Sequence, residues 1–482
     1  MPYPASWPDA WRPCATRREG AALAMLAWLC LGFIGVALLQ ATLGSTSWAL
    51  LAVAALAVLA ALPLLVLSTP PQALLVTLLA YTLCAFYLTL GLTQHFAMDA
   101  RTAFAGFKNL LLLTVLVWWA LGPGGTASPW RPMEWLFALF LVALVWVETP
   151  MLAPRLGYFL NSFLPLLLCF LALRRLPEGG AYRPRQGSAL LVITLAFLAT
   201  APLGWIISHH LIDSEVLIAQ QAAKGYGHIE GYPRNWWTYL QGELYLRLSG
   251  TAEDPVLYGY FAAFLGYLWL ARGGLVWVGL LSLVVLASMV KGAMLLMASG
   301  LAFWWLFQGA RPLARLHGIL GALLMLLLIA FYVWASGVSE TSADVHVLGL
   351  WLPFQQVLVG EVGAWQAWFG HGLGSSGNLY KASLGGALSN LEWLRGGAES
   401  GFGLVFYQTG AVGLALLLWL VYRGTRHLKA PAARGLWVIY WANAAVQENL
   451  INLNYLTLLL AALALLEAWH GKEGTLHEDR HH

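Results

Sequence analysis

Two basic residues stand at the edges of long apolar runs. Arg247 belongs to the segment YLRLSGTAEDP, and Lys291 belongs to SMVKGAML. A guanidinium can bind two phosphate oxygens at once, and a charge near the membrane interior normally faces a polar cavity or a partner. Both residues therefore predict contacts to a phosphate-bearing ligand. The alternatives are an interfacial Arg247 paired with Glu253 or Asp254, and a Lys291 in a loop at the water surface.

The acidic candidate is Glu399, in the segment GAESGFG, where a long polar stretch returns to an apolar run. A carboxylate there can act as general base for a sugar hydroxyl, and partial burial would raise its pKa. Ser400 follows directly, and Gln408 lies further along the same run. A helix N-terminus also favours an acidic residue, so a structural Glu399 is the alternative.

A glycine-rich turn precedes this acid, in the segment FGHGLGSSGNLY from Phe369 to Tyr380. Glycine exposes the backbone, so the N–H groups of Gly372 and Gly374 could approach an anionic ligand. His371 lies inside the turn and could be a second acid or base, or a surface residue. A further polar stretch, from Gln447 to Asn454, could line the same cavity or join helices by hydrogen bonds.

Neither a metal nor another cofactor is expected. The chain contains four cysteines, three of them inside apolar segments, and no HExxH or comparable spacing of metal ligands. We therefore predict no zinc site and no disulfide framework.

The elements that must position these residues are membrane spans. Of the 482 residues, 60% are hydrophobic and 10% charged, against about 25% charged in a soluble domain. The net charge is +4, but the basic residues are scattered, so we expect no nucleic-acid partner. Apolar runs of about 20 residues recur and predict an all-α, polytopic transmembrane bundle of about 12 to 14 spans. Our segmentation gives fourteen, near 21–42, 48–67, 73–93, 105–122, 133–148, 158–173, 188–208, 256–271, 275–290, 292–308, 317–336, 402–422, 436–450 and 453–469.

The distribution of Lys and Arg predicts the orientation of these spans, since short cytoplasmic loops accumulate both. Residues 1–20 and 470–482 then form cytoplasmic tails around a single transmembrane domain at 21–469. Two long loops, 209–255 and 337–401, lie on the opposite face and contain the candidate residues Arg247, His371 and Glu399. Within the second loop, Glu361 to Phe369 and Leu388 to Leu394 mix Trp, Leu and polar residues as interfacial helices do.

In this order, the segments resemble the bacterial O-antigen ligase and O-antigen polymerase superfamily of integral membrane glycosyltransferases. The Arg-x-x-Gly motif of that family, followed by Pro, resembles Arg247, Gly250 and Pro255, and its basic-Gly-Ala hairpin resembles Lys291 to Ala293. Its Gly-x-Gly turn resembles Gly370 to Gly374, and its last motif resembles the segment from Gln408 to Gly413. Ligases have a His-Asn pair where this chain has Glu399 and Ser400, so the chain is closer to the polysaccharide polymerases.

The resemblance implies a fold similar to the C-type membrane glycosyltransferases and a substrate of undecaprenyl-pyrophosphate-linked oligosaccharide. It implies polymerisation into exopolysaccharide or O-antigen at the periplasmic face of the bacterial inner membrane, with inversion and without a metal. Arg247 and Lys291, with Gly372 and Gly374, would bind the pyrophosphate, and Glu399 would activate the acceptor. His371, Ser400 and Gln408 would be further site residues. A flippase and a chain-length regulator would be partners.

Two other functions remain open at this point. One is a ligase or protein O-oligosaccharyltransferase of the same superfamily, which moves finished glycan to lipid A core or to a protein. The other is a transporter or flippase of lipid-linked sugars, although transporters tend to place charges near mid-membrane rather than at one face.

Overall fold

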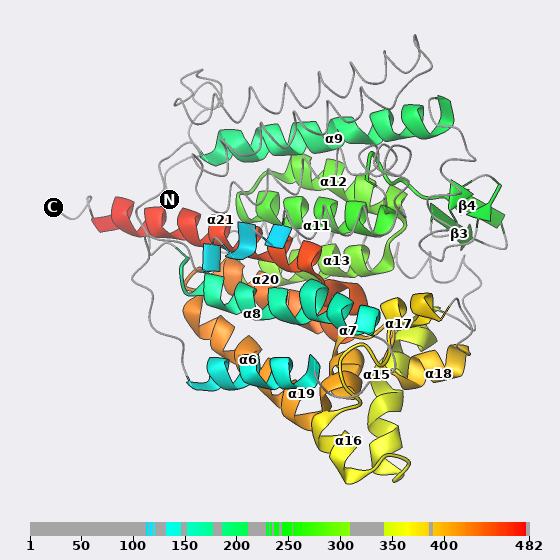
Figure 1. Cartoon of the computed structure of the whole chain (residues 1–482). Coiled ribbons are helices and arrows are strands. Elements are labelled where there is room, and N and C mark those ends of the chain that lie inside the picture. The colour runs from blue at the N-terminus through cyan, green and yellow to red at the C-terminus, as the bar shows by residue number, and fades with distance from the viewer. Residues whose placement is uncertain are drawn as a thin grey trace, which may run out of the picture.

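The computed structural model describes residues 112–113, 115–117, 119–120, 132–145, 152–176, 186–210, 228–230, 232–233, 236–240, 243–252, 254–308, 342–384 and 389–478. This part of the chain is mostly helical (Figure 1). The predicted spans at 21–42, 48–67, 73–93 and 317–336 lie outside the described residues, and the one at 105–122 does so in large part.

Every predicted span within the described ranges overlaps a helix, but the one at 436–450 is α-helical only to Ala445, and Gln447 and Glu448 lie in the turn that follows. The helices are α6 (Pro132–Val145), α7 (Leu152–Tyr158), the π-helical turn η1 (Phe159–Phe163), α8 (Leu164–Leu173), α9 (Gln186–His210), α11 (Pro255–Ala271), α12 (Leu275–Ser288), α13 (Lys291–Gln308), α19 (Gly401–His427), α20 (Pro431–Ala445) and α21 (Leu453–Glu478). Three stretches are long and apolar enough to cross a membrane: Pro154–Leu173, Gly401–His427 and Leu453–His470. They indicate a membrane protein.

The two long polar loops are folded. The first contains four short strands, β1 (His228–Ile229), β2 (Tyr232–Pro233), β3 (Trp237–Leu240) and β4 (Glu243–Leu246). They pair antiparallel as two separate two-stranded sheets, an addition to the predicted all-α class within described residues that are mostly helical. Aromatic residues at Tyr232, Trp237 and Tyr239 favour extended backbone over helix, which accounts for the difference.

The second loop folds into four helices. They are α15 (Ser342–Leu358), α16 (Ala364–Phe369), α17 (Asn378–Ser383) and α18 (Asn390–Arg395). Helices α16 and α18 coincide with the two predicted interfacial segments. Ser389 begins α18 with a reciprocal capping box, in which its hydroxyl accepts from the Glu392 N–H and the Glu392 carboxylate accepts from the Ser389 N–H.

The bundle core is packed by aromatic rings and by glycines that let helices approach. Helix α11 packs against α12, α13 and α21, and α20 packs against α13 and α19. The ring of Tyr267 lies against Gly300 of α13, and a Cβ at that glycine would stand 2.7 Å from the ring. Phe197 stacks on Tyr258 with centroids 4.5 Å apart. This packing fixes the helix ends on which the polar residues stand.

The polar elements gather at one end of the bundle. In Figure 1, helices α11, α12, α13 and α21 run side by side, and strands β3 and β4 lie at the same end of them as α17 and α18. The last turns of α21 lie at the opposite end. Three connections therefore meet near the folded loops: the segment after β4, the turn between α12 and α13, and the turn between α20 and α21.

Candidate functional site

Glu399 lies in the turn between α18 and α19, with its backbone in the left-handed region at φ 65°. A residue other than glycine pays about 1–3 kcal/mol for such a conformation, so surrounding contacts must hold it. The side chain is 25% exposed, which leaves it partly open to a ligand. Burial raises the pKa of the Glu399 carboxyl, and the positive charge of Lys381 lowers it. A carboxyl group with a raised pKa is a better proton acceptor once ionised.

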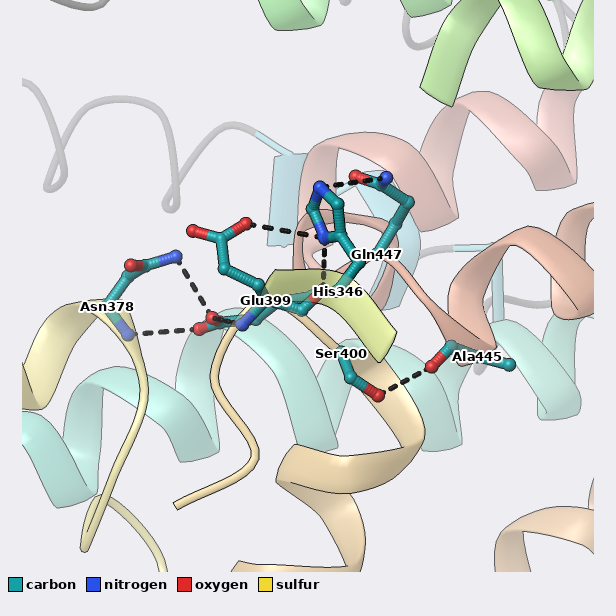
Figure 2. Close-up of polar contacts among 7 residues, drawn as sticks. His346, Asn378, Glu399, Ser400, Ala445 and Gln447 are labelled. Atoms are coloured by element: carbon teal, nitrogen blue, oxygen red, sulfur yellow. Dashed lines mark hydrogen bonds and ion pairs between the residues drawn. The ribbon is translucent and has the colours of Figure 1, made fainter. Parts of the chain in front are cut away.

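His346, from the first turns of α15, lies directly against Glu399 (Figure 2). Its Nδ1 is 2.8 Å from the backbone oxygen of Glu399 and 3.7 Å from Oε2 of the carboxylate. Because a carbonyl can only accept, Nδ1 carries the proton of that hydrogen bond. Burial lowers the pKa of His346, the hydrogen bond to Glu399 raises it, and the charge of Lys291 lowers it. The net direction is downward, which favours the neutral ring.

The two predicted cations meet at the turn between α12 and α13. Nε of Arg247 donates to the backbone oxygen of Ser288 at 3.0 Å, and the Leu248 N–H donates to Ala287 at 3.0 Å. These bonds hold the segment after β4 on the C-terminal end of α12, directly before Lys291. Burial and the charge of Arg247 both lower the pKa of Lys291. Lys291 begins α13, whose N-terminal dipole adds to the positive field.

The cations and the acid are linked through Gln447. A Cβ at Gly292, next to Lys291, would stand 3.2 Å from the Gln447 side-chain carbon Cδ. The Gln447 Nε2 in turn lies 3.5 Å from Nε2 of His346, and His346 contacts Glu399. One continuous cluster is thus formed by residues of α13, α15, the segment after β4, the turn before α19 and the turn between α20 and α21. We call it the Glu399 cluster: Arg247, Lys291, His346, Glu399, Gln447 and Glu448.

Glu448 is the buried member of this cluster, with 8% of its surface exposed. Its carboxylate accepts hydrogen bonds from the Tyr158 hydroxyl at 2.8 Å, from both nitrogens of Asn378 and from the Glu399 N–H at 3.2 Å. Burial and the neighbouring Glu399 charge raise the pKa of Glu448 to about 7, although the hydrogen bonds from Tyr158, Asn378 and Glu399 act against this.

Ser400 and Gln408, predicted as further site residues, are fully buried and have structural partners. The Ser400 hydroxyl donates to the Ala445 oxygen at 2.6 Å and accepts from the Gly403 N–H at 2.9 Å, which caps the start of α19. The Gln408 amide donates to Ser376 and accepts from the Gly374 N–H. Both side chains therefore fix the loop on α19, and the Ser400 cap sets where Glu399 precedes the helix.

The glycine turn is packed into the protein. The N–H groups of Gly372 and Gly374 donate to the backbone and side-chain oxygens of Gln408, so both bond within the chain. A Cβ at Gly374 would stand 2.4 Å from the Arg155 backbone nitrogen. The turn thus closes on α7 and α19, and the predicted pyrophosphate contacts of Gly372 and Gly374 have no support in this arrangement.

His371, also in the turn, is separate from the Glu399 cluster. Its ring stacks on Tyr407 with centroids 4.1 Å apart, and its Nδ1 lies 3.2 Å from the Tyr407 oxygen. Burial lowers the pKa of His371. It lines a small hollow beside Pro353 and Gln356 of α15, which lie two to three turns beyond His346.

Arg247, Lys291 and Glu399 belong to one cluster, as proposed from the sequence, whereas His371 does not. The sequence reasoning missed His346 and Glu448 as members. His346 carried no signal beyond its place in an external loop, while the polar stretch at Gln447 to Asn454 pointed to Glu448 without saying which partner it meets.

The described residues contain no group of three His, Cys, Asp or Glu side chains close enough to hold a metal ion. Comparison of the chain with protein-family models, with curated proteins and with solved structures gives no match.

Proposed function

We propose that this chain is a polytopic inner-membrane glycosyltransferase that polymerises undecaprenyl-pyrophosphate-linked oligosaccharide repeat units at the periplasmic face. The observation that supports this most is the juxtaposition of two cations, Arg247 and Lys291, with the partly exposed carboxylate of Glu399 through His346 and Gln447. Glycosyl transfer from a diphosphate carrier needs positive charge where the leaving group departs and a proton acceptor where the hydroxyl attacks.

In the proposed reaction, a hydroxyl oxygen of the acceptor glycan attacks the anomeric carbon of the donor. The bond from that carbon to the diphosphate oxygen breaks with inversion, and its electron pair leaves with the diphosphate. Arg247 and Lys291 offset the charge that develops on this group. Glu399 takes the hydroxyl proton, and His346 orients Glu399 through its hydrogen bond to the backbone. Each contact has a side chain of the required charge in the cluster.

The proposed membrane orientation follows from the same elements. The cluster lies at the ends of α12, α13 and α19, beside the folded loops, while Arg423, Arg426 and Arg434 follow at the other end of α19. Apolar side chains of the α15–α16 hairpin are exposed, with Leu358 at 73% and Trp365 at 63%. Helix α16 packs on α19, a candidate span, so its outer face fits the lipid interface.

The test is polymerisation by purified protein in lipid nanodiscs, with a defined undecaprenyl-pyrophosphate-linked repeat unit and product length read on a gel. The proposal predicts a ladder of chain lengths, lost in Lys291→Ala and retained in Lys429→Ala, an exposed lysine after α19. Single transfer of a preformed chain to lipid A core or to protein would identify a ligase instead. Movement of the carrier across a bilayer without any lengthening would identify a flippase.

A further inference from the structure

The turn between α20 and α21 places Glu448 where segments from distant parts of the chain meet. Its Oε1 accepts from the Tyr158 hydroxyl of α7 at 2.8 Å and from the Asn378 N–H at 3.1 Å. Its Oε2 accepts from the Asn378 side chain at 3.0 Å and from the Glu399 N–H at 3.2 Å. Three of the four groups can only donate, whereas the Tyr158 hydroxyl can donate or accept. Protonation of Glu448 would therefore reverse the bond to Tyr158 and remove the negative charge that strengthens the bond from the Glu399 N–H.

The bond to the Glu399 N–H is the one that reaches the reacting end of the cluster. Glu399 has a left-handed backbone, which a glutamate adopts only where its surroundings hold it. Glu448 binds its N–H, and His346 binds its carbonyl at 2.8 Å. The Glu399 main chain is therefore held by hydrogen bonds at both its N–H and its carbonyl, and Figure 2 shows its carboxylate next to His346.

We propose that Glu448 is a positioning residue for glycosyl transfer: its ionised carboxylate holds the Glu399 main chain so that the Glu399 side chain meets the acceptor hydroxyl. Protonation of Glu448 weakens this hold and slows the reaction. The inference rests on the proposed function and assigns to that site a second carboxylate with a different task from the first.

The charged groups around Glu448 determine the pH at which this occurs. Glu399 faces it from the turn before α19, and Tyr158 faces it from α7. Lys381 of α17 and Lys291 of α13 act on the neighbouring Glu399 and His346. Because burial and Glu399 raise the pKa of Glu448 to about 7, activity should fall as the pH drops through about 7. The two carboxyls titrate as a coupled pair, so this limb belongs to both.

Stability should move in the opposite direction. The folded protein raises the pKa of Glu448 above that of an ordinary carboxyl, so it favours the protonated form. The stabilisation from this group is complete below the unfolded pKa and is lost as the pH rises to about 7. A purely structural role for Glu448 would leave the acid limb of the rate profile to Glu399 alone, whereas a positioning role makes that limb move with changes around Glu448.

The experiment compares pH–rate profiles for wild type, Tyr158→Phe, Glu448→Gln and Glu467→Gln in the polymerisation assay. Tyr158→Phe removes a hydrogen bond that lowers the pKa of Glu448, so the acid limb should move up by about half to one pH unit, with kcat near the wild-type value at high pH. Glu448→Gln turns an amide N–H₂ toward donors and should lower kcat about tenfold or more with little change in KM. Glu467→Gln, a buried carboxyl at the other end of α21, should leave the profile unchanged.

Infrared difference titration of the same variants gives a readout that does not need turnover. A protonated buried carboxyl band should appear below about pH 7 in wild type, move to higher pH in Tyr158→Phe and vanish in Glu448→Gln. An unshifted rate profile in Tyr158→Phe, or wild-type kcat in Glu448→Gln, would overturn the inference while wild-type polymerisation upholds the proposed function. If wild type forms no polymer, the proposed function fails. In that case, an infrared carboxyl band that is the same in wild type, Tyr158→Phe and Glu448→Gln overturns this inference separately.

Discussion

The apolar stretch Leu453–His470 of α21 has a buried glutamate near each end, and the two glutamates differ in what surrounds them. Near the C-terminal end, Glu467 accepts from the backbone N–H groups of Lys429 and Ala430 at 2.8 and 2.9 Å, directly before α20. Before the N-terminal end, Glu448 accepts from Tyr158, Asn378 and Glu399, which belong to three separate segments. Both carboxylates are satisfied by hydrogen bonds, but the charge that acts on them differs in sign. Besides burial, the negative charge of Glu399 raises the pKa of Glu448, whereas the positive charges of His470 and Arg434 act on Glu467.

The comparison teaches that burial and hydrogen bonding do not by themselves mark a functional carboxylate. Glu467 satisfies the N–H groups at the start of a helix, which is an ordinary structural task. Glu448 binds the backbone of a residue in a strained conformation, whose carbonyl is bound by His346. The distinguishing feature is a second carboxylate next to the buried one, in the same cluster as a histidine and two cations, which provides both an acid–base group and an anion site.

Among variants that compare the two ends of the bundle, the largest effect should come from the arginines Arg247 and Arg434. Nε of Arg247 donates to the Ser288 oxygen, and Nε of Arg434 donates to the Leu428 oxygen, so alanine removes an equivalent hydrogen bond in each case. Arg247→Ala should lower kcat/KM for carrier-linked glycan by about 10²–10³, because it removes charge that faces the leaving diphosphate. Arg434→Ala should change only the thermal midpoint. Equal loss of activity in Arg247→Ala and Arg434→Ala would show that the two ends of the bundle do not differ in function.

A smaller effect should show whether a glycine at the end of the bundle that holds the Glu399 cluster packs against the protein or contacts the ligand. Gly374 and Gly360 have nearly the same positive φ, 75° and 76°, but only Gly374 faces a backbone atom that a Cβ would strike. Alanine costs about 1–3 kcal/mol at either position for the left-handed backbone, and more at Gly374 because the chain must shift. Gly374→Ala should therefore lower the thermal midpoint further than Gly360→Ala.

The same pair of variants sharpens the reinterpretation of the glycine turn. The N–H of Gly374 bonds to Gln408, so the folded Gly374→Ala protein should keep a KM for the carrier close to that of Gly360→Ala. A selective rise in KM, with matched stability after correction for the folded fraction, would instead restore the pyrophosphate role predicted from the sequence.

The smallest effect on activity should come from the exposed surface of α15 and α16. Nitroxide labels at Leu358→Cys and Trp365→Cys, in a background with the native cysteines replaced, should show high oxygen accessibility in nanodiscs, because both side chains are exposed and the proposed orientation places them against lipid. A label at Asn390→Cys, an exposed polar position on α18, should be more accessible to a water-soluble nickel complex. The reverse pattern would place the hairpin away from the membrane.

The sequence was sufficient to predict these helices because the length of each apolar run indicates where a helix forms. The predicted run at 256–271 became Pro255–Ala271, where Asp254 caps the helix through the Val256 N–H and Pro255 stands at its first position. The convergence of Arg247, Lys291 and Glu399 also followed, since residues at the same ends of spans must lie near the same surface.

Contacts between distant segments could not be obtained in this way. His346 contacts Glu399, 53 positions later, and Tyr158 bonds to Glu448, 290 positions later, and neither spacing has a period. The role of Gly374 was missed because the same residue type serves an open anion site and a tight contact. The two strand pairs were missed because their segments are short and lie within a stretch judged only by its polarity.

The most direct test of the account is the rate of chain elongation in Glu399→Gln, measured in nanodiscs with saturating carrier-linked repeat unit. The matched control is Glu392→Gln, which changes a fully exposed glutamate in the capping box of α18. The account predicts a loss of about 10²–10⁴ in kcat for Glu399→Gln, with folding intact, and a near wild-type rate for Glu392→Gln. Wild-type elongation by Glu399→Gln would contradict it.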